Sequence, residues 1–143
     1  MTAFYDKHGI QFRYPENWKL VHEQTIELPF DVSIQTPGGG FWSVHVYDDS
    51  TDPETLASEA LRTMRQEYDE VESETIREHI GDTEAVGYEM NFYCLDLICT
   101  ARALAFRSTQ QTVLVLYQAE SREFDEIGKV FQAMTLSLQR PEA

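Results

Sequence analysis

Two cysteines, Cys94 and Cys99, are the first residues of this sequence whose type and spacing could support chemistry. A structural zinc site needs about four ligands in tetrahedral geometry, and this pair, with no histidine nearby, supplies only two of them. A redox pair is the other chemical interpretation. The plainer one is two small hydrophobic side chains near the end of a hairpin, and we expect both thiols to be reduced in the native protein.

The four histidines could act as acids, bases or ligands, but their positions follow no metal-binding or catalytic spacing. The sequence also contains no G-x-S-x-G elbow, no P-loop and no G-x-G-x-x-G fingerprint. We therefore expect a protein that is not an enzyme and that uses no metal and no cofactor. The alternative is a small hydrolase with dispersed catalytic residues, which would need a pocket that joins a histidine or cysteine to a carboxylate. The histidines are His8, His22, His45 and His79.

The excess of acidic residues limits the classes of partner. Asp and Glu outnumber Lys and Arg by 25 to 11, and the formal net charge is −14. Affinity for nucleic acid depends on Lys and Arg that displace phosphate counterions, so we expect no nucleic-acid partner. An anionic membrane surface is disfavoured for the same reason, and no stretch approaches the roughly 20 apolar residues of a membrane helix. A protein with a basic surface is the class that remains, while improved solubility is the simpler interpretation of the charge.

Two acidic clusters and one aromatic residue are the candidates for binding such a partner. The first cluster lies between a strand and a helix, and it lacks the D-x-D-x-D-G order and the distal Glu of an EF-hand. The second follows the predicted middle helix and indicates either a solvated face or the site of a basic partner. Phe41 and Trp42 must point to opposite sides of a strand, so one enters the core and the other can anchor a partner. The candidate partner-binding residues are Trp42, Asp48, Asp49, Glu70, Glu72 and Glu74.

Alternating apolar residues predict several strands in the amino-terminal third of the chain. Pro15 ends one of them, because proline cannot donate a hydrogen bond to a sheet. The segment from Pro37 to Gly40 predicts a flexible hairpin tip, since neither a helix nor a lysine follows it to complete a phosphate site. The expected strands are 4–6, 10–14, 20–23, 25–28, 32–36 and 41–47.

Two amphipathic helices separated by four strands are expected in the rest of the chain. The first helix begins after Asp52, a good N-cap, with Pro53 in its first position, and it ends near Tyr68. The second runs from about 122 to 138, with Ser121 as its N-cap. The strand at 112–119 is apolar on both faces, which is typical of a central strand. The other three strands are 72–80, 84–94 and 98–107.

These elements together predict an α+β fold. We expect a central antiparallel sheet of about six to eight strands flanked by two main helices, an αβα sandwich. A chain of 143 residues has the usual size of one domain, and no repeat or linker divides it, so we expect a single domain over residues 1–143. The amino terminus has neither a basic start nor an apolar segment, and this predicts a cytoplasmic protein.

The segment from Phe12 to Trp18, FRYPENW, resembles the F-x-Y-P-x-x-W opening of the PsbP-like family. Bacterial DcrB-type domains and the Ran-binding import factor Mog share this fold. The resemblance extends over most of the chain, through a glycine-bearing hairpin, a middle helix, an antiparallel meander and a last helix. It implies a PsbP/Mog-like fold and a non-catalytic, chaperone-like protein that binds or assists other proteins. We see no leader of the kind that directs PsbP to the thylakoid lumen, so we expect no photosystem role. We expect the residues of this segment to fix the start of the sheet.

Overall fold

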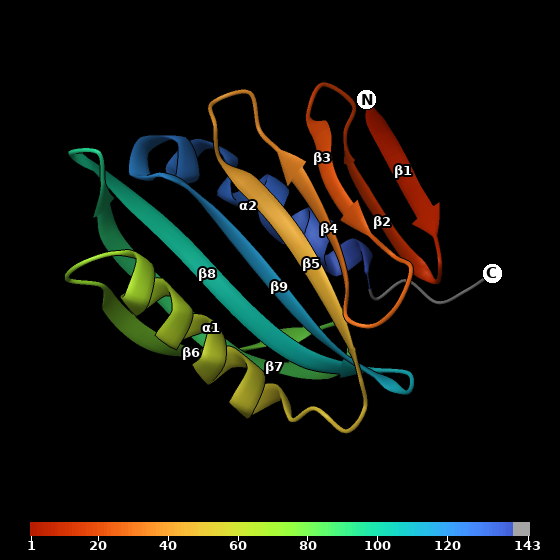
Figure 1. The fold of residues 1–143 in the computed structure, drawn as a ribbon. Coiled ribbons are helices and arrows are strands. Elements are labelled where there is room, and N and C mark those ends of the chain that lie inside the picture. Colours follow the sequence, from red (N-terminus) through yellow and green to blue (C-terminus); the bar gives the residue numbers. More distant parts are fainter. Residues whose placement is uncertain (139–143) are drawn as a thin grey trace.

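The structure, a computed structural model, describes residues 1–138. These residues form a seven-stranded antiparallel sheet, a separate two-stranded sheet and two helices, in agreement with the predicted α+β fold (Figure 1). The helices are α1 (Pro53–Glu67) and α2 (Ser121–Ser137). The strands are β1 (Thr2–Lys7), β2 (Ile10–Pro15), β3 (Lys19–Gln24), β4 (Phe30–Gln35), β5 (Phe41–Asp48), β6 (Glu72–Ile80), β7 (Thr83–Cys94), β8 (Leu97–Ser108) and β9 (Gln111–Glu120).

The main sheet has the strand order β3-β4-β5-β9-β8-β7-β6. Strand β9 lies in its middle, which confirms the central position predicted from its two apolar faces. Helix α1 packs on one face, against β7, β8 and β9. Helix α2 and the β1–β2 hairpin cover the other face, so that the sheet lies between two layers (Figure 1).

Helix α1 begins and ends where the sequence predicts. The carboxylate of Asp52 accepts a hydrogen bond from the backbone N–H of Thr55 at 3.0 Å, and Pro53 occupies the first helical position. The helix ends at Tyr68, whose N–H bonds to the carbonyl of Met64. One stripe of the helix is buried against the sheet, and it consists of Leu56, Ala57, Leu61 and Met64.

Helix α2 is capped by a different residue from the one predicted. The carboxylate of Glu120 accepts hydrogen bonds from the N–H groups of Arg122 (2.7 Å) and Glu123 (3.2 Å). The hydroxyl of Ser121, which we expected to cap the helix, is instead hydrogen-bonded to the hydroxyl of Thr100 at 2.9 Å. Glutamate can take the cap because its longer side chain folds back to the two free N–H groups.

The β1–β2 hairpin forms its own sheet, so the expectation that Phe12 to Trp18 starts the main sheet is wrong. The hairpin lies across the α2 side of the main sheet, and the ring centroid of Phe12 is 4.7 Å from that of Trp42. The ring of Trp18 meets that of Phe131 of α2 edge-on, at 5.6 Å. These aromatic residues therefore join the two sheets to α2.

Two connections differ from their predicted forms. Residues 25–28 form no strand, because the side chain of Gln24 organises them as a loop: its amide donates to the carbonyls of Glu27 and Pro29, each at 3.1 Å. The glycine-rich tip between β4 and β5 is anchored, because the hydroxyl of Thr36 donates to the carboxylate of Glu123 in α2 at 2.8 Å. This carboxylate occupies the space beside the tip, which makes a phosphate site there still less suitable.

Candidate functional site

The two helices leave two parts of the main sheet uncovered, one on each face. Within residues 1–138, helix α2 covers its face over β8, β9 and the Ile80 end of β6, and the rest of β6 and β7 on that face is open. On the opposite face, α1 covers β7 to β9, and among the same residues no other helix lies over β3, β4 and β5. We call the first the acidic quarter, and its charged residues are Glu72, Glu74, Glu78, Glu89 and Arg102. We call the second the histidine quarter, and its polar core is His22, Asp31, Ser43 and His45.

Strand register assembles the acidic quarter from distant parts of the chain. Glu74 of β6 pairs with Glu89 of β7, Glu89 pairs with Arg102 of β8, and Arg102 pairs with Tyr117 of β9. Side chains of directly paired residues lie on the same face of a sheet. A single row across four strands therefore carries two carboxylates, a guanidinium and a phenol.

Arg102 is the buried centre of this row. Its Nη2 lies 2.6 Å from a carboxylate oxygen of Glu78, and its Nε lies 3.1 Å from one of Glu89. The Arg102 side chain is 12% exposed, whereas those of Glu78 and Glu89 are 35% and 36% exposed. A buried guanidinium needs such partners, because an uncompensated charge in the interior is costly. Glu78 and Glu89 therefore form ion pairs with Arg102, while Glu72 and Glu74 are exposed on β6.

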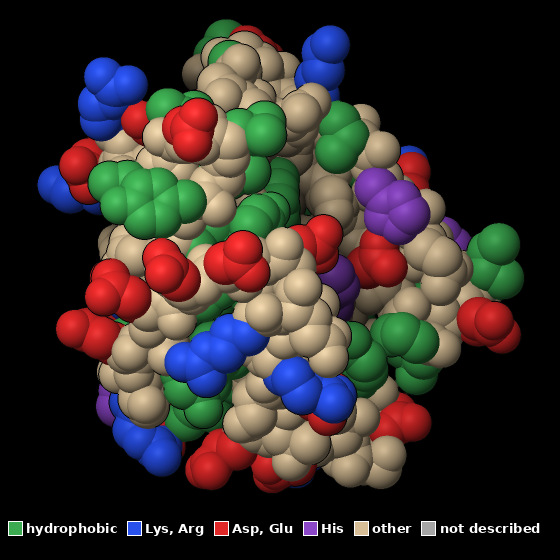
Figure 2. All heavy atoms as spheres, turned by 60° about the vertical axis from the view of Figure 1, so that its left-hand side comes forward, with side chains coloured by type: hydrophobic (Ala, Val, Ile, Leu, Met, Phe, Trp, Pro, Cys, Tyr) green, Lys and Arg blue, Asp and Glu red, His purple; other side chains and the backbone are tan. Residues whose placement is uncertain are grey.

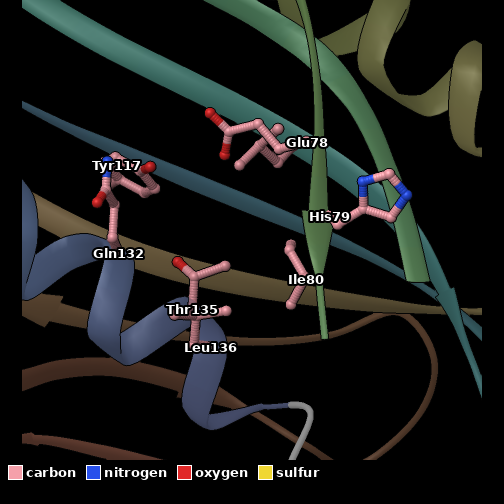
Figure 3. Close-up of a pocket in the computed structure, with 8 residues that line it drawn as sticks. Glu78, His79, Ile80, Tyr117, Gln132, Thr135 and Leu136 are labelled. Atoms are coloured by element: carbon pink, nitrogen blue, oxygen red, sulfur yellow. The ribbon is translucent and has the colours of Figure 1, made fainter. Parts of the chain in front are cut away.

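A cavity of about 300 Å³ lies between β6 and α2, next to Glu78, which is the ion-pair partner of Arg102 (Figure 3). Glu78, Tyr117 and Gln132 bring a carboxylate, a phenol and an amide to it, and Leu104 and Leu136 add apolar surface. The pKa of Tyr117 is raised, chiefly because burial disfavours the phenolate, although the nearby guanidinium acts in the opposite direction. Tyr117 therefore keeps its proton at neutral pH and can donate a hydrogen bond.

The cavity does not supply the machinery of a hydrolase. His79 also lines it, but His79 and Glu78 are neighbours on β6 and project to opposite sides of the strand (Figure 3). The polar groups that converge there can bind a cationic or hydrogen-bonding group. They do not pair a nucleophile with a base.

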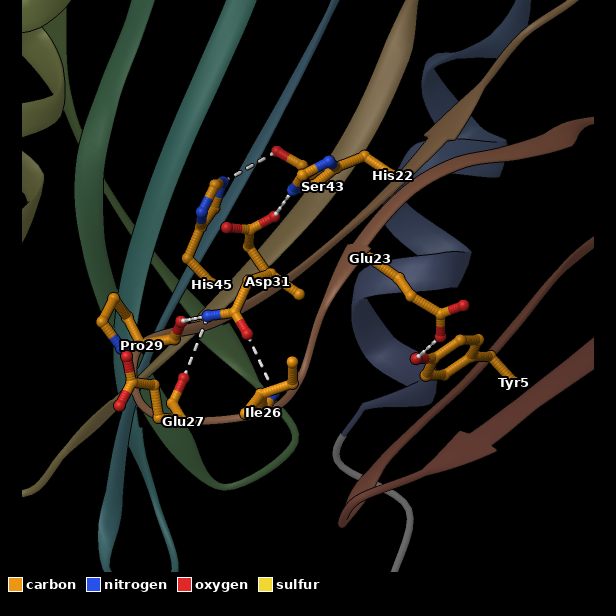
Figure 4. A network of polar contacts seen from close by, with 10 residues as sticks. Tyr5, His22, Glu23, Ile26, Glu27, Pro29, Asp31, Ser43 and His45 are labelled. Carbon is orange, nitrogen blue, oxygen red and sulfur yellow. Dashed lines mark hydrogen bonds and ion pairs between the residues drawn. The ribbon is translucent and has the colours of Figure 1, made fainter.

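The histidine quarter contains two hydrogen-bonded pairs (Figure 4). Ser43 Oγ lies 3.0 Å from Nε2 of His45, and Nε2 of His22 lies 2.6 Å from a carboxylate oxygen of Asp31. Asp31 and His45 are directly opposite each other on β4 and β5. A serine, two histidines and an aspartate thus gather on one face, and Figure 2 shows histidine and acidic side chains close together on the surface.

Their arrangement is nevertheless unsuited to nucleophilic catalysis. Ser43 is 3% exposed, and its hydroxyl also donates to the carbonyl of Leu116 at 3.2 Å. Asp31 is bonded to His22 and does not orient His45, as the third member of a triad would. Burial lowers the pKa of His45, so this imidazole is neutral at pH 7. The cluster is therefore a set of satisfied polar pairs.

Trp42 is not on the surface, so its predicted use as an exposed anchor is wrong. It is completely buried, and its indole N–H donates to the hydroxyl of Thr135 in α2 at 3.1 Å. It shares its face of β5 with the buried Val44, whereas Phe41, on the other face, is half-buried. Alternation along β5 indicated this choice, because the valines already marked the core face.

The acidic candidates lie in three separate places. Asp48 ends β5 and Asp49 follows it, and both are exposed. The hydroxyl of Ser50, and also its backbone N–H at 3.0 Å, donate to a carboxylate oxygen of Asp48 and lower the pKa of that carboxyl. Glu70 lies in the loop between α1 and β6 with a φ of 55°. Glu72 and Glu74 lie in the acidic quarter, where they share a surface with the buried Arg102.

Sequence reasoning missed Arg102, Glu89 and Tyr117. No local motif marks them, because they meet through the pairing of β7, β8 and β9. A usable signal was the hairpin turn at residues 95–96, which places Glu89 opposite Arg102 once the register is counted back from it.

The remaining features of the structure give weaker evidence for a function. Within residues 1–138, no three His, Cys, Asp or Glu side chains form a group that could hold a metal ion. Burial, with a further contribution from Cys94, raises the pKa of the Cys99 thiol, which makes that thiol less reactive. Neither α1 nor α2 is long and apolar enough to span a membrane.

Several solved structures resemble this one, although no protein-family model matches the sequence and no curated protein matches it significantly. The solution structure of cyanobacterial PsbP (CyanoP) from Synechocystis sp. PCC 6803 has a TM-score of 0.69 and 14% identity, over 95% of this chain and 90% of that chain. LpqN, described as involved in cell envelope biogenesis of Mycobacterium tuberculosis, has a TM-score of 0.60 and 11% identity, over 94% and 86%. A mutant of the protein Mog1 has a TM-score of 0.55 and 8% identity, over 96% and 87%.

Proposed function

We propose that this chain, which has the PsbP/Mog-like fold, is a non-catalytic, chaperone-like accessory protein that binds a partner protein through the acidic quarter. The partner class is a protein with a basic surface. The observation that carries the proposal is the composition of the acidic quarter, where four glutamates face one arginine. The four negative charges minus one positive charge leave a formal charge of −3 on this surface.

Charge of this kind favours association with a basic surface. Glu72 and Glu74 are exposed, so they can meet a lysine or arginine of the partner without a large desolvation cost. The whole chain, at −14, adds a long-range attraction that increases the rate of encounter with basic proteins. Figure 2 shows that acidic side chains also outnumber basic ones on the face in view.

The cavity beside Glu78 adds specificity to this attraction. Glu78 stays paired with Arg102, but its carboxylate is 35% exposed and, together with the amide of Gln132, can accept hydrogen bonds from one basic side chain of the partner. Leu104 and Leu136 can contact the aliphatic part of such a side chain.

A reducing compartment such as the cytoplasm fits the two free thiols.

Affinity capture with matched variants tests this function. The immobilised protein is incubated with an extract of the source cells at about 0.05 M and about 0.5 M salt, because screening weakens exposed charge pairs. We expect the wild type to retain a defined partner at low salt and to lose most of it at high salt. The double variant Glu72→Gln/Glu74→Gln should retain several-fold less of the same partner at low salt.

The matched control removes the same charge elsewhere. Asp125 and Glu126 are exposed on α2, and the variant Asp125→Asn/Glu126→Gln also removes two negative charges. It should capture the partner as well as the wild type does. Equal losses in both double variants would show that net charge alone matters and would overturn the assignment to the acidic quarter.

A further inference from the structure

Strand β6 is the outermost strand of the main sheet and is paired along one side. Its nine residues pair with β7 from Glu72 to Ile80 without a register shift. Within residues 1–138, no strand pairs with its other side. An edge of this kind presents free backbone N–H and C=O groups that can bind a further strand.

The turn after β6 shows which backbone groups are free. Ile80 and Thr83 flank the two-residue turn at Gly81, so they form the hydrogen-bonded pair that closes the hairpin. Hydrogen-bonded pairs recur at every second residue of an antiparallel ladder. The even-numbered residues of β6 therefore bond to β7, and the outward N–H and C=O groups belong to Ser73, Thr75, Arg77 and His79.

The opposite edge of the sheet is less suitable for such pairing. Strand β3 has six residues, and its register with β4 shifts between Leu20 and His22. A bulge twists an edge and interrupts its regular row of backbone groups. The long, regular edge is therefore that of β6.

The side chains of β6 determine which strand can pair with it. Glu72, Glu74 and Glu78 lie on the α2 side, with Ile76 between the last two, so Glu72 and Glu74 are about 7 Å apart along the strand and Glu74 and Glu78 about 13 Å. A second copy of β6 would place carboxylates against carboxylates, which is unfavourable. On the other side of β6, Arg77 is already paired with Glu84, at 3.3 Å. The excess charge on this edge is therefore negative.

We propose that the outer edge of β6 binds an extended, basic segment of the partner protein as an additional strand of the sheet. The proposal rests on the proposed function and specifies how the acidic quarter holds its partner. Backbone hydrogen bonds to residues 73, 75, 77 and 79 supply the register. Lysine or arginine of the segment opposite Glu72, Glu74 and Glu78 meets these carboxylates, and the one opposite Glu78 reaches the cavity beside it.

A synthetic peptide tests the proposal without a known partner. The probe is a nine-residue peptide with blocked ends in which Arg alternates with Thr, and fluorescence anisotropy measures its binding to the whole chain. We expect saturable binding, slower amide hydrogen exchange at Ser73, Thr75, Arg77 and His79, and at least tenfold weaker binding of the same peptide N-methylated on alternate residues. Glu in place of Arg in the peptide should abolish binding.

A proline on the edge of β6 gives the matched protein variant. Thr75 is exposed and its N–H points outward, so Thr75→Pro removes one docking group while the β6–β7 ladder is kept. We expect at least tenfold weaker peptide binding by Thr75→Pro and unchanged binding by Thr75→Val, which keeps the N–H. The hydrogen-exchange measurement uses only the wild-type chain, so it tests strand addition even if Thr75→Pro is poorly folded.

The outcomes separate the two proposals. Unchanged exchange at the four outward amides, equal binding of the N-methylated peptide, or no binding at about 1 mM peptide overturns strand addition. If one of these results is found and the variant Glu72→Gln/Glu74→Gln still captures less partner than the wild type, the acidic quarter binds its partner by charge alone. If neither double variant changes partner capture but the peptide protects the four amides, the edge binds strands and the proposed function fails.

Discussion

The acidic quarter and the histidine quarter are the two uncovered parts of one sheet, and they satisfy their polar groups differently. In the acidic quarter the buried Arg102 takes up two carboxylates, and two more remain exposed. In the histidine quarter each group has a local partner: Ser43 bonds to His45 and His22 bonds to Asp31. The first surface has an excess of charge and a cavity beside it, whereas the polar core of the second is locally satisfied.

This difference shows that the type of a residue does not by itself indicate whether its polar groups are free or already paired. The histidine quarter contains the serine, histidine and aspartate that a search for catalytic residues would select, yet each of them is already paired with a neighbour, and Ser43 is also buried. The acidic quarter contains no serine, histidine and aspartate set of this kind, yet it carries an excess of negative charge. Availability for binding distinguishes the two quarters.

The largest expected effect is that of removing the arginine from the acidic quarter. Arg102→Met should lower the free energy of unfolding by about 2–3 kcal/mol, because it leaves Glu78 and Glu89 without their counter-ion. This value is below that of a fully buried pair because water reaches both carboxylates. Urea denaturation of the variant and the wild type measures the loss.

Replacing the two glutamates that face Arg102 by glutamines should restore most of the stability that Arg102→Met loses. Adding Glu78→Gln and Glu89→Gln to Arg102→Met removes the repulsion that the single change creates, so most of the stability should return. A triple variant no more stable than Arg102→Met would show that the arginine acts through packing, and the contrast in charge between the quarters would be lost.

The fold was predictable from local patterns, while the site depended on contacts between distant segments. The two helices and most strands follow from alternation and from the cap at Asp52. The exposed position assigned to Trp42 failed because its neighbours on β5 place it in the core with Phe12 and Thr135. The separate β1–β2 sheet could not be foreseen, because strand periodicity does not specify which strand is the neighbour.

A smaller effect is expected in the histidine quarter. Ser43→Ala should lower the free energy of unfolding by about 1 kcal/mol, because it removes one hydrogen-bonding group between His45 and the carbonyl of Leu116. Ser43→Thr, which keeps the hydroxyl, should lose less stability than Ser43→Ala. If Ser43→Ala cost as much as Arg102→Met, the two quarters would not differ in the way that their charges indicate.

The smallest effect is a pH dependence confined to the histidine quarter. Burial lowers the pKa of His45 in the folded protein below the value of about 6.5 expected for the unfolded chain. Between these two pKa values the unfolded chain binds more protons, so stability rises with pH in this window and is complete above about pH 6.5. Urea denaturation from pH 7.5 to pH 5.5 should therefore show a loss of stability that His45→Gln reduces. Parallel curves for the two proteins would mean that the imidazole is as easily protonated as a solvated one, and the burial of His45 would then not distinguish the histidine quarter from the acidic quarter.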